Sequence, residues 1–521
     1  MDTSAHDIPP AFRRAVDRAP ALCTRPASVM HPTTSTDRVP WASMLILNKR
    51  FTRIVTAGIV FVTLFYFLRD KHVEIALEYN HVFHLDASTV QDVCAEFAKD
   101  DLLQLIQPVL KMGHGERRDK IEAQLDSVCA CFAEDELLIF SDLAETVRGR
   151  TVVDILADLP RGYFNATMNP DIKNYIMQKE MQVEGTLDVD VEATKRINGW
   201  ILDKYKFLPM VQRAWEAKPD RPFYFFLETD TYVFWDNAVR FLTTLDPDKQ
   251  LYMGSPSPGR HDEEQDIKTW FANGGPGFVL SRGAVKALLD RKEADGKMEP
   301  PLVEKWLSLL SMECCGDSVV GWTLWNISVP LQGYWPLFNP HPLHGIPFSD
   351  PYWCQPAVTL HKTTPDDVKR LWLWESEQKR FKLNRPILYS DVWNFHHPVQ
   401  QPIRRNWDNG EWDNFRPPVE ANIDSPESCE DFCRGEASCM QWLWRGLDEK
   451  QCILMRSARY GQPRRPEPMP EEEGGETPLG TRLKRMTDFT SGWVQERIVQ
   501  WREEHVCREV QWVEPSIERI F

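Results

Sequence analysis

The sequence lacks an excess of positive charge. It carries 61 Lys and Arg residues against 77 Asp and Glu residues, which gives a net charge of −16 and a pI near 5.4. A broad nucleic-acid-binding surface needs clustered cations, so this balance argues against nucleic acid as a partner. With 26% charged and 42% hydrophobic residues the composition is that of a folded protein. The length of 521 residues suggests roughly three domains at ~150 residues each.

The chain also lacks an apolar run as long as a typical membrane span. Ile54–Leu68 is uncharged but has only 15 residues, which make a helix of about 22 Å against a hydrocarbon core of ~30 Å. Arg53 and Arg69 can snorkel, and thinner early-secretory membranes reduce the mismatch. A buried core helix is the alternative, but the preceding Pro- and Ser/Thr-rich segment has no periodicity. A cleaved signal peptide fits less well, because the run starts late and ends in bulky aromatics. We therefore predict a transmembrane signal anchor.

Charges and cysteines predict its orientation. Up to Arg53 there are eight Lys and Arg residues against four Asp, and the positive-inside rule then leaves the N-terminus in the cytoplasm. Only one of the 12 cysteines precedes the run, so 11 would lie in a compartment where disulfides form. Asn165-Ala-Thr and Asn326-Ile-Ser are candidate N-glycosylation sites. The expected topology is single-pass type II, with a lumenal body.

Phe223–Val233 is an almost wholly apolar run that ends in two carboxylates, Glu228 and Asp230. Such a run predicts a strand buried on both faces of a mostly parallel sheet. Residues i and i+2 of a strand share a face, so both carboxylates can point the same way at its carboxyl end, where ligands of open α/β sheets bind. Two carboxylates there suit a hard divalent cation, although an acidic loop is the commoner explanation of such a pair.

Strand and helix patterns alternate around this run. Leu102–Leu110 and Glu136–Asp142 have strand patterns, whereas Arg117–Phe132 and Leu187–Trp215 show helical spacing of apolar residues. This alternation predicts βαβ units and a parallel sheet, that is, an α/β fold. Ser255–Asp266 is polar and is predicted to be a loop.

Glycine is concentrated in Trp270–Ser281, which contains three Gly in four residues and leads into a predicted helix, Arg282–Leu289. Glycine permits positive φ and close approach of the backbone to a ligand. A tight turn that needs glycine for its geometry alone is a serious alternative.

Four blocks together resemble fringe-like and core-1-type β-1,3-glycosyltransferases, glycosyltransferase family 31, and are most similar to the fungal members. They occur in the order of the family and cover about residues 100–380. The blocks are Phe223–Val233, Trp270–Ser281, Cys315–Gly321 and Val358–Lys362.

The resemblance implies a GT-A fold with a Rossmann-like sheet that uses a UDP-sugar donor and Mn²⁺. It implies Asp230 and His361 as metal ligands, since carboxylate with imidazole suits Mn²⁺. It implies Asp317 as the general base that removes the acceptor hydroxyl's proton during an inverting displacement. The donor and acceptor pocket implied by the resemblance comprises Glu228, Thr229, Trp270, Gly274 and Gly275.

Each role has a plainer alternative. A histidine such as His361 is more often an ordinary hydrogen-bonded residue, and Asp317 could be a helix N-cap. The chain also departs from the family pattern, with Glu228 in place of Asp and with Gly316 where relatives often carry an acid. These departures keep open a non-catalytic glycan-binding membrane protein that retains the sheet as a scaffold.

The C-terminal part is rich in cysteine, with the spacing Cys429-x3-Cys433-x5-Cys439-x12-Cys452. Four cysteines allow three pairings, and oxidation is favoured over a metal site in a lumenal segment. The segment resembles a PAN/apple module, a small disulfide-rich α+β domain that binds proteins or carbohydrates. That resemblance implies the pairs Cys429–Cys452 and Cys433–Cys439. The remaining lumenal cysteines that we considered have no assigned partner: Cys314, Cys315, Cys354 and Cys507.

The sequence and the resemblance therefore predict a Golgi membrane glycosyltransferase that moves a hexose or N-acetylhexosamine from a UDP-sugar to a glycan or glycoprotein, and the resemblance favours a β-1,3 linkage. The partners are the nucleotide sugar, the acceptor and the membrane. The expected segments are a cytoplasmic tail (1–53), the anchor (54–68), a stem (69–100), a GT-A domain (101–395), a linker (396–427) and a PAN/apple-like domain (428–521).

Overall fold

The computed structural model describes residues 85–189, 194–294, 296–380, 385–395, 402–410, 414–468 and 486–518. The predicted tail and anchor, and the stem up to residue 84, lie outside these residues. Among the described helices, none has the length and apolar character required to cross a membrane.

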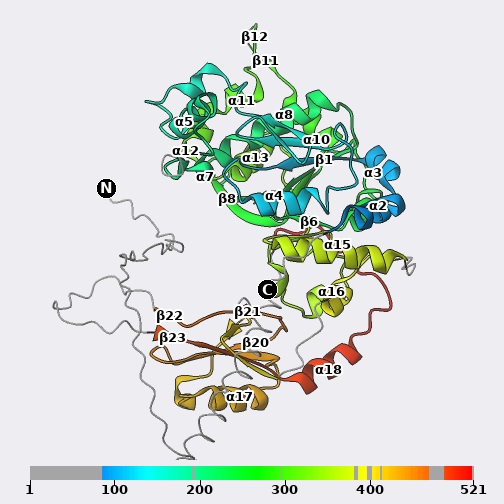
Figure 1. The fold of residues 1–521 in the computed structure, drawn as a ribbon, viewed down its shortest axis with the longest axis vertical. Helices are drawn as coiled ribbons and strands as arrows, with labels where there is room; N and C mark the ends of the chain where they lie inside the picture. Colours follow the sequence, from blue (N-terminus) through cyan, green and yellow to red (C-terminus); the bar gives the residue numbers. More distant parts are fainter. Residues whose placement is uncertain are drawn as a thin grey trace, which may run out of the picture. The chain divides into compact units, whose positions relative to one another are not determined.

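A mixed eight-stranded sheet organises the larger part of the described chain (Figure 1), in the order β13-β7-β10-β5-β1-β2-β4-β3. β1 pairs in parallel with β5 and β2, as the alternating pattern predicts, whereas β10 is antiparallel to both β5 and β7. The fold is α/β with a mixed central sheet, consistent with GT-A. The strands are β1 (Ile106–Lys111), β2 (Leu138–Ser141), β3 (Glu145–Val147), β4 (Arg150–Asp154), β5 (Phe223–Glu228), β7 (Tyr252–Gly254), β10 (Phe278–Ser281) and β13 (Leu331–Gly333).

β5 explains why the sheet is covered on both faces. Phe223, Phe225 and Leu227 point into one hydrophobic core, and Tyr224 and Phe226 point into the other, as the two-residue period of a strand requires. All five side chains are at most 1% exposed. The apolar run is thus the central strand that its composition predicts.

Two sets of helices cover these faces (Figure 1). The face of Tyr224 is covered by α5 (Ile172–Glu184), α7 (Gly199–Leu202), α8 (Phe207–Ala217), α10 (Arg282–Leu289), α11 (Leu302–Lys305), α12 (Leu307–Met312) and α13 (Gly316–Trp325). The face of Phe225 is covered by α3 (Lys99–Leu105), α4 (Arg118–Leu125), α9 (Trp235–Leu242), α15 (Pro365–Arg380) and α16 (Tyr389–Phe395). α2 (Ala87–Glu96) packs against the same core.

Small sheets complete this part. β6 (Tyr232–Val233), β14 (Phe338–Asn339) and β15 (Thr359–Leu360) form a three-stranded sheet, and β11 (Glu293–Ala294) pairs with β12 (Lys297–Met298). β8 (Pro256–Asp262) and β9 (Ile267–Ala272) form a hairpin. Ser255–Asp266 is therefore not the polar loop that we predicted. Its alternating exposed and covered residues belong to an antiparallel ribbon, against which α13 packs.

Other predicted elements differ at their ends. Leu102–Leu110 begins as helix, because α3 runs to Leu105 with two acidic residues in its first turn, and the strand starts at Ile106. The helical pattern Leu187–Trp215 contains α7, a short 3₁₀ turn at Asp203–Tyr205 and α8. The end of the expected stem is not separate from the domain, since Cys94 of α2 forms a disulfide with Cys131.

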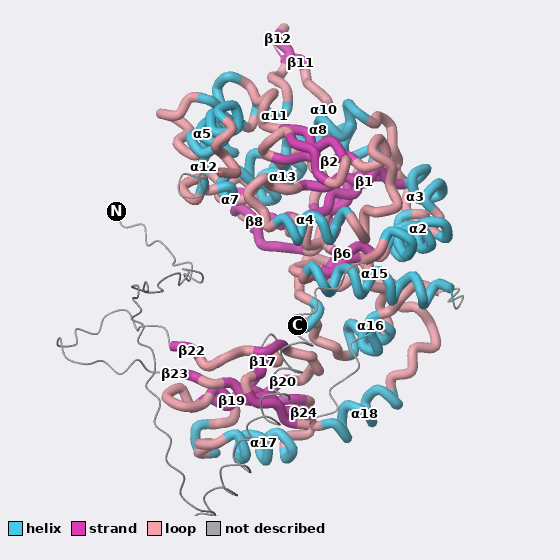
Figure 2. Tube along the Cα trace, in the orientation of Figure 1, coloured by secondary structure: helices cyan, strands magenta, loops and turns pink. Residues whose placement is uncertain are grey.

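The C-terminal part contains an antiparallel five-stranded sheet in the order β16-β24-β19-β20-β18, with α17 (Pro426–Gly435) along it (Figure 2). Its strands are β16 (Ile403–Arg405), β18 (Asn414–Phe415), β19 (Gln441–Arg445), β20 (Gln451–Met455) and β24 (Phe489–Trp493). β16 and β18 fall within residues 396–427, which we predicted to be a linker. Their shortness and the surrounding Pro and Gly hide the strand pattern.

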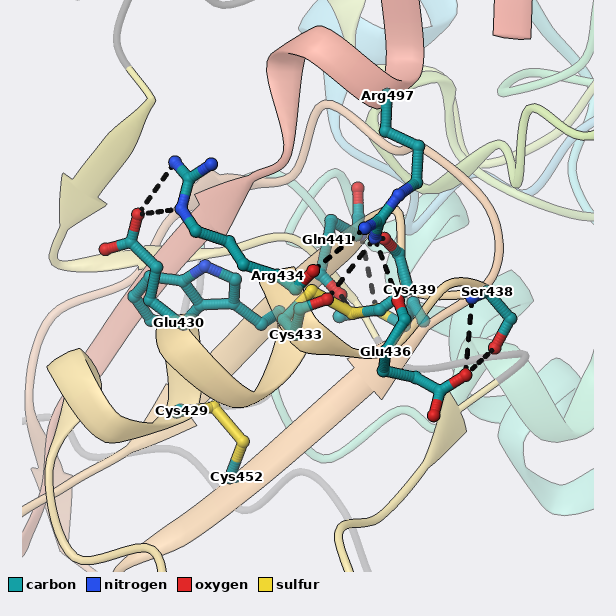
Figure 3. Close-up of a disulfide and its surroundings, with 12 residues drawn as sticks. Cys429, Glu430, Cys433, Arg434, Glu436, Ser438, Cys439, Gln441, Cys452 and Arg497 are labelled. Carbon is teal, nitrogen blue, oxygen red and sulfur yellow. Dashed lines mark hydrogen bonds and ion pairs between the residues drawn. A yellow bond between two sulfur atoms is a disulfide. The ribbon is translucent and has the colours of Figure 1, made fainter.

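One disulfide fastens α17 to this sheet, a second joins it to the segment before β19, and an arginine of another helix binds its carboxyl end (Figure 3). Cys429 pairs with Cys452 of β20, and Cys433 with Cys439, which are the pairs that we expected. Arg497 of α18 (Gln495–Glu504) donates to the carbonyl groups of Arg434 and Glu436 at 3.0 and 2.9 Å. The carbonyl groups at the end of a helix have no partner within it, so this arginine supplies one.

The described residues belong to one compact unit, and several contacts within it join the segment of the eight-stranded sheet to that of the five-stranded sheet. Cys354 of the loop after α14 (Asp350–Trp353) forms a disulfide with Cys507 beyond α18. Phe348 and Ala458 form an antiparallel bridge, and Arg459 donates through Nε to the carbonyl of Gly345 at 3.2 Å.

Candidate active site

The carboxyl end of β5 carries the two predicted carboxylates in a fixed turn. Glu228 is the last residue of the strand, and its backbone N–H donates to Thr231 Oγ1 at 2.9 Å. The Thr231 hydroxyl in turn donates to the carbonyl of Gly275 at 2.7 Å. Asp230 lies inside this turn, so the glycine-rich block holds the segment that presents it.

Pairing between β6 and β15 brings the predicted histidine to the same place. Leu360 lies opposite Tyr232 in the antiparallel register, so His361 comes next to the turn containing Asp230. Thr363 strengthens this contact, since its hydroxyl donates to the carbonyl of Asp230 at 2.8 Å. His361 Nε2 lies 3.6 Å from Asp230 Oδ1, although 130 residues separate them in the sequence.

Glu228, Asp230 and His361 each offer one potential ligand atom, and these atoms lie within 4.8 Å of one another. Asp230 Oδ1 is buried without a hydrogen-bond partner among the described residues. A buried carboxylate oxygen without a donor is unfavourable unless a cation compensates it. The donor set, two carboxylates with one imidazole, fits a divalent metal such as Mn²⁺.

Burial sets the protonation of this cluster. It lowers the pKa of His361 to about 4, against the opposing influence of Asp230, so the imidazole is neutral and able to ligate at neutral pH. Burial likewise raises the pKa of Glu228 to about 7, although Lys111 acts in the opposite direction. Near neutral pH the site therefore holds a neutral imidazole beside a carboxyl, Glu228, that gains or loses its proton easily.

Two lysines that we did not predict compensate these carboxylates. Lys120 Nζ lies 3.0 Å from Asp230 Oδ2, and Lys111 Nζ lies 3.2 Å from Glu228 Oε1. The parallel register explains the second contact, because Lys111 ends β1 directly beside Glu228 at the end of β5. Lys111 also contacts Asp203 at 2.6 Å. A buried lysine at the end of an apolar strand is the sequence signal that could have identified Lys111.

Asp317 is the second residue of α13 and is held by backbone donors. Its Oδ2 accepts from the N–H of Gly274 at 2.8 Å, and its Oδ1 accepts from the N–H of Ser318 at 2.9 Å. Burial raises the pKa of this carboxyl above its ordinary value, and the two N–H groups oppose the shift. Cys315, not Asp317, is the N-cap of α13, so the alternative capping role is wrong.

The structure also explains why glycine occupies position 316. A Cβ atom there would lie 2.5 Å from the carbonyl oxygen of Lys204 and equally close to the ring of Phe207. No side chain fits between α13 and these neighbours, so close packing excludes an acidic residue at this position.

Gly274 and Gly275 lie between the predicted base, Asp317, and the three potential metal ligands Glu228, Asp230 and His361. A Cβ at Gly274 would lie 2.8 Å from Phe207 and 3.1 Å from Glu228 Oε1, and a Cβ at Gly275 would lie 2.1 Å from the His361 ring. Gly274 also donates to Asp317. The glycine-rich block therefore touches Glu228, His361 and Asp317, and brings these residues of distant blocks around one location.

The other predicted pocket residues behave differently. Thr229 is 1% exposed, and its hydroxyl donates to a carboxylate oxygen of Glu116. Its hydrogen-bond donor is therefore engaged by another residue of the protein. Trp270 is half-buried in β9 and packs partly against the helix-covered core. The described contacts of Trp270 do not include the carboxylate cluster.

Both candidate glycosylation residues are exposed. Asn165 follows a 3₁₀ turn at Arg161–Phe164, and Asn326 caps the carboxyl end of α13. Nδ2 of Asn326 donates to the carbonyl of Trp322 at 2.7 Å. Exposure is required of an acceptor asparagine, and whether either residue is modified stays a prediction.

Comparison with known proteins gives one family match. Residues 204–310 match the family described as Fringe-like, so this segment is similar to the Fringe-like domains of glycosyltransferase family 31. It contains α8, β5 with Glu228 and Asp230, and the glycine-rich block, and it ends before Asp317 and His361. The match indicates a glycosyltransferase family and suggests β-1,3-glycosyl transfer. No curated protein matches the chain.

Proposed function

We propose that the protein is an inverting glycosyltransferase that moves a hexose or N-acetylhexosamine from a UDP-sugar to a glycan or glycoprotein, forming a β-1,3 linkage. One observation carries the proposal: three potential metal-ligand atoms lie within 4.8 Å of one another, and Gly274 connects them to the partly buried carboxylate of Asp317 on another element. The Fringe-like match over residues 204–310 supports the same reaction class.

Asp230, His361 and Glu228 would hold Mn²⁺, which supplies electrostatic stabilisation of the departing diphosphate when it is bound. Asp317 would accept the proton of the acceptor hydroxyl as that oxygen attacks the anomeric carbon. The raised pKa of Asp317 makes it a stronger base than an exposed aspartate, and the N–H of Gly274 fixes its direction. Lys111 and Lys120 bring two ammonium groups to the side where a nucleotide diphosphate would lie.

The compartment belongs to the same proposal. Four disulfides and a Fringe-like domain fit a location in the secretory pathway. We propose a Golgi enzyme held as a type II membrane protein by residues 54–68, with a PAN/apple-like module that binds protein or carbohydrate at its C-terminal end. The helix α17 with its two disulfides supports that module assignment.

The test uses full-length protein purified in detergent and a panel of UDP-sugars with Mn²⁺. Formation of UDP from one donor, and its loss in Asp230→Asn, would support the proposal. Wild-type protein that neither binds nor consumes any nucleotide sugar would contradict it and favour the glycan-binding alternative. The control is Gly435→Ala, because a Cβ at the exposed end of α17 has no neighbour within 4 Å.

A further inference from the structure

Two adjacent cysteines stand apart from the other thiols of the chain. Eleven cysteines lie in the described residues, and eight of them form the four disulfides. Cys129 is buried and alone, whereas the Sγ atoms of Cys314 and Cys315 lie 2.6 Å apart. A disulfide bond is ~2.05 Å long, so closing the bond needs a sulfur displacement of only about half an ångström.

The backbone on both sides of this pair is fixed. Lys204 Nζ donates to the carbonyl groups of Ser311 and Glu313 at 3.2 and 2.9 Å. Beyond the pair, Gly316 lies against the backbone of Lys204, and the Ser318 hydroxyl donates to the carbonyl of Cys315 at 3.2 Å. The contact between the two sulfurs is therefore part of an anchored turn.

The two thiols differ in access. Cys314 is exposed, whereas Cys315 is partly covered. Burial raises the pKa of Cys315 to about 12, and its hydrogen bond with Cys314 adds to the shift. A thiolate is the attacking species in thiol–disulfide exchange, so the exposed Cys314 is the group that reacts first with a reagent in solution.

We propose that Cys314 and Cys315 form a reversible vicinal disulfide that sets the first turn of α13. The Cys314 thiolate attacks a small-molecule disulfide such as oxidised glutathione, and one thiol leaves. Cys315 then attacks Sγ of Cys314, which forms the intramolecular bond and releases the second thiol. The two electrons reside on the sulfurs of the released thiols, and the two cysteine protons are transferred to them.

Such a bond differs from the other four in one respect. Adjacent α-carbons are ~3.8 Å apart, which is shorter than the 4.4–6.8 Å that disulfides usually span. This separation makes the bond easier to reduce, and partly exposed bonds of that kind are the labile ones. Asp317 lies two residues beyond Cys315, so the bond would act on the turn that carries the proposed base.

Mass spectrometry of the full-length protein tests the proposal. The protein is treated with oxidised glutathione, alkylated without reduction, and digested with chymotrypsin to isolate the peptide containing Cys314. We expect this peptide unalkylated and 2 Da lighter than its dithiol form, and we expect a dithiothreitol titration to open it before the other four bonds. Two alkylated thiols, or a stable glutathione adduct, would overturn the proposal.

Two further measurements complete the test. In Cys315→Ser, Cys314 should retain the glutathione adduct, because the thiol that resolves it is missing, whereas Cys129→Ser should leave the 2 Da difference intact. Hydrogen exchange of the amides in α13 should increase on selective reduction of the pair, and unchanged exchange would overturn the effect on the turn. These readouts need no glycosyl transfer, so their failure is distinguishable from failure of the proposed activity.

Discussion

Gly275 lies directly against the ring of His361: a Cβ atom at position 275 would be 2.1 Å from His361 Nε2. The glycine-rich block is therefore more than a turn that needs glycine for its backbone angles. Because Gly275 has no side chain, the imidazole of His361 can occupy the space next to Asp230. The sequence alone does not show that the glycine-rich block and the block containing His361 are in contact. The pairing of β15 with β6 brings them together.

Gly275→Ala should displace His361 and weaken metal binding by about 10- to 100-fold, the usual effect of disturbing a ligand's support. The measurement is calorimetric titration of Mn²⁺ into the full-length protein. Gly435→Ala is the matched control, because its Cβ meets nothing within 4 Å. Equal Mn²⁺ affinity in Gly275→Ala and wild type would show that His361 is not a ligand.

Asp317→Asn should lower kcat by about 10²- to 10⁴-fold, the range for loss of a general base. The amide keeps the size of the carboxylate and still offers an oxygen to the N–H of Gly274. Donor affinity should therefore change little, and the measurement is kcat beside the Kd of UDP. A kcat close to that of wild type would assign the base elsewhere.

Removal of the Cys354–Cys507 disulfide should destabilise the protein strongly. The bond spans 153 residues, and chain-entropy arguments give about 5 kcal/mol for such a loop. The Cys433–Cys439 bond spans 6 residues, for which the same relation gives about 2 kcal/mol. Urea unfolding of the two double Ser variants compares them. A smaller loss from removing the long-range bond would contradict this expectation.

Stability should also depend on pH through His114. Its Nδ1 lies 3.3 Å from Glu145 Oε1 and its Nε2 lies 3.5 Å from Asp188, with Asp142 nearby, while Arg118 faces Glu145 from the other side. The hydrogen bond with Glu145 raises the pKa of His114 in the folded state, against the effect of burial.

A raised folded-state pKa means that protonated His114 stabilises the fold. This contribution is complete below about pH 6.5, the unfolded-state value, and is lost as the pH rises through the folded-state pKa. We expect a change of about 1 kcal/mol, the size of one hydrogen bond. Urea unfolding across this range should show the change in wild type, and His114→Gln should remove it. An identical pH dependence in both proteins would contradict the assignment.

The sequence predicts the parts of the fold that follow a simple period. The run Phe223–Glu228 is a central strand because alternate residues enter two cores, and Arg282–Leu289 is a helix with Ser281 as its N-cap. The hairpin β8–β9 is missed because its exposed residues resemble a loop. β16 and β18 are missed because strands of two or three residues have no readable period.

The candidate site is predictable only where residues are close in sequence or match a family block. Glu228 and Asp230 follow from one strand end, whereas their proximity to His361 depends on the pairing of β15 with β6. Lys111 comes beside Glu228 through strand register alone. Periodicity contains no information about which strands become neighbours, so the pairing of Lys111 with Glu228 emerges only from the structure.

Calorimetric titration of UDP into the full-length protein, with Mn²⁺ and again with EDTA, tests the metal-dependent nucleotide site most directly. The account predicts binding with Mn²⁺ that weakens more than about tenfold, or 1.4 kcal/mol, when the metal is removed. It predicts a similar loss in Asp230→Asn with Mn²⁺ present. UDP binding of equal strength in all three titrations, or no binding in any of them, would contradict it.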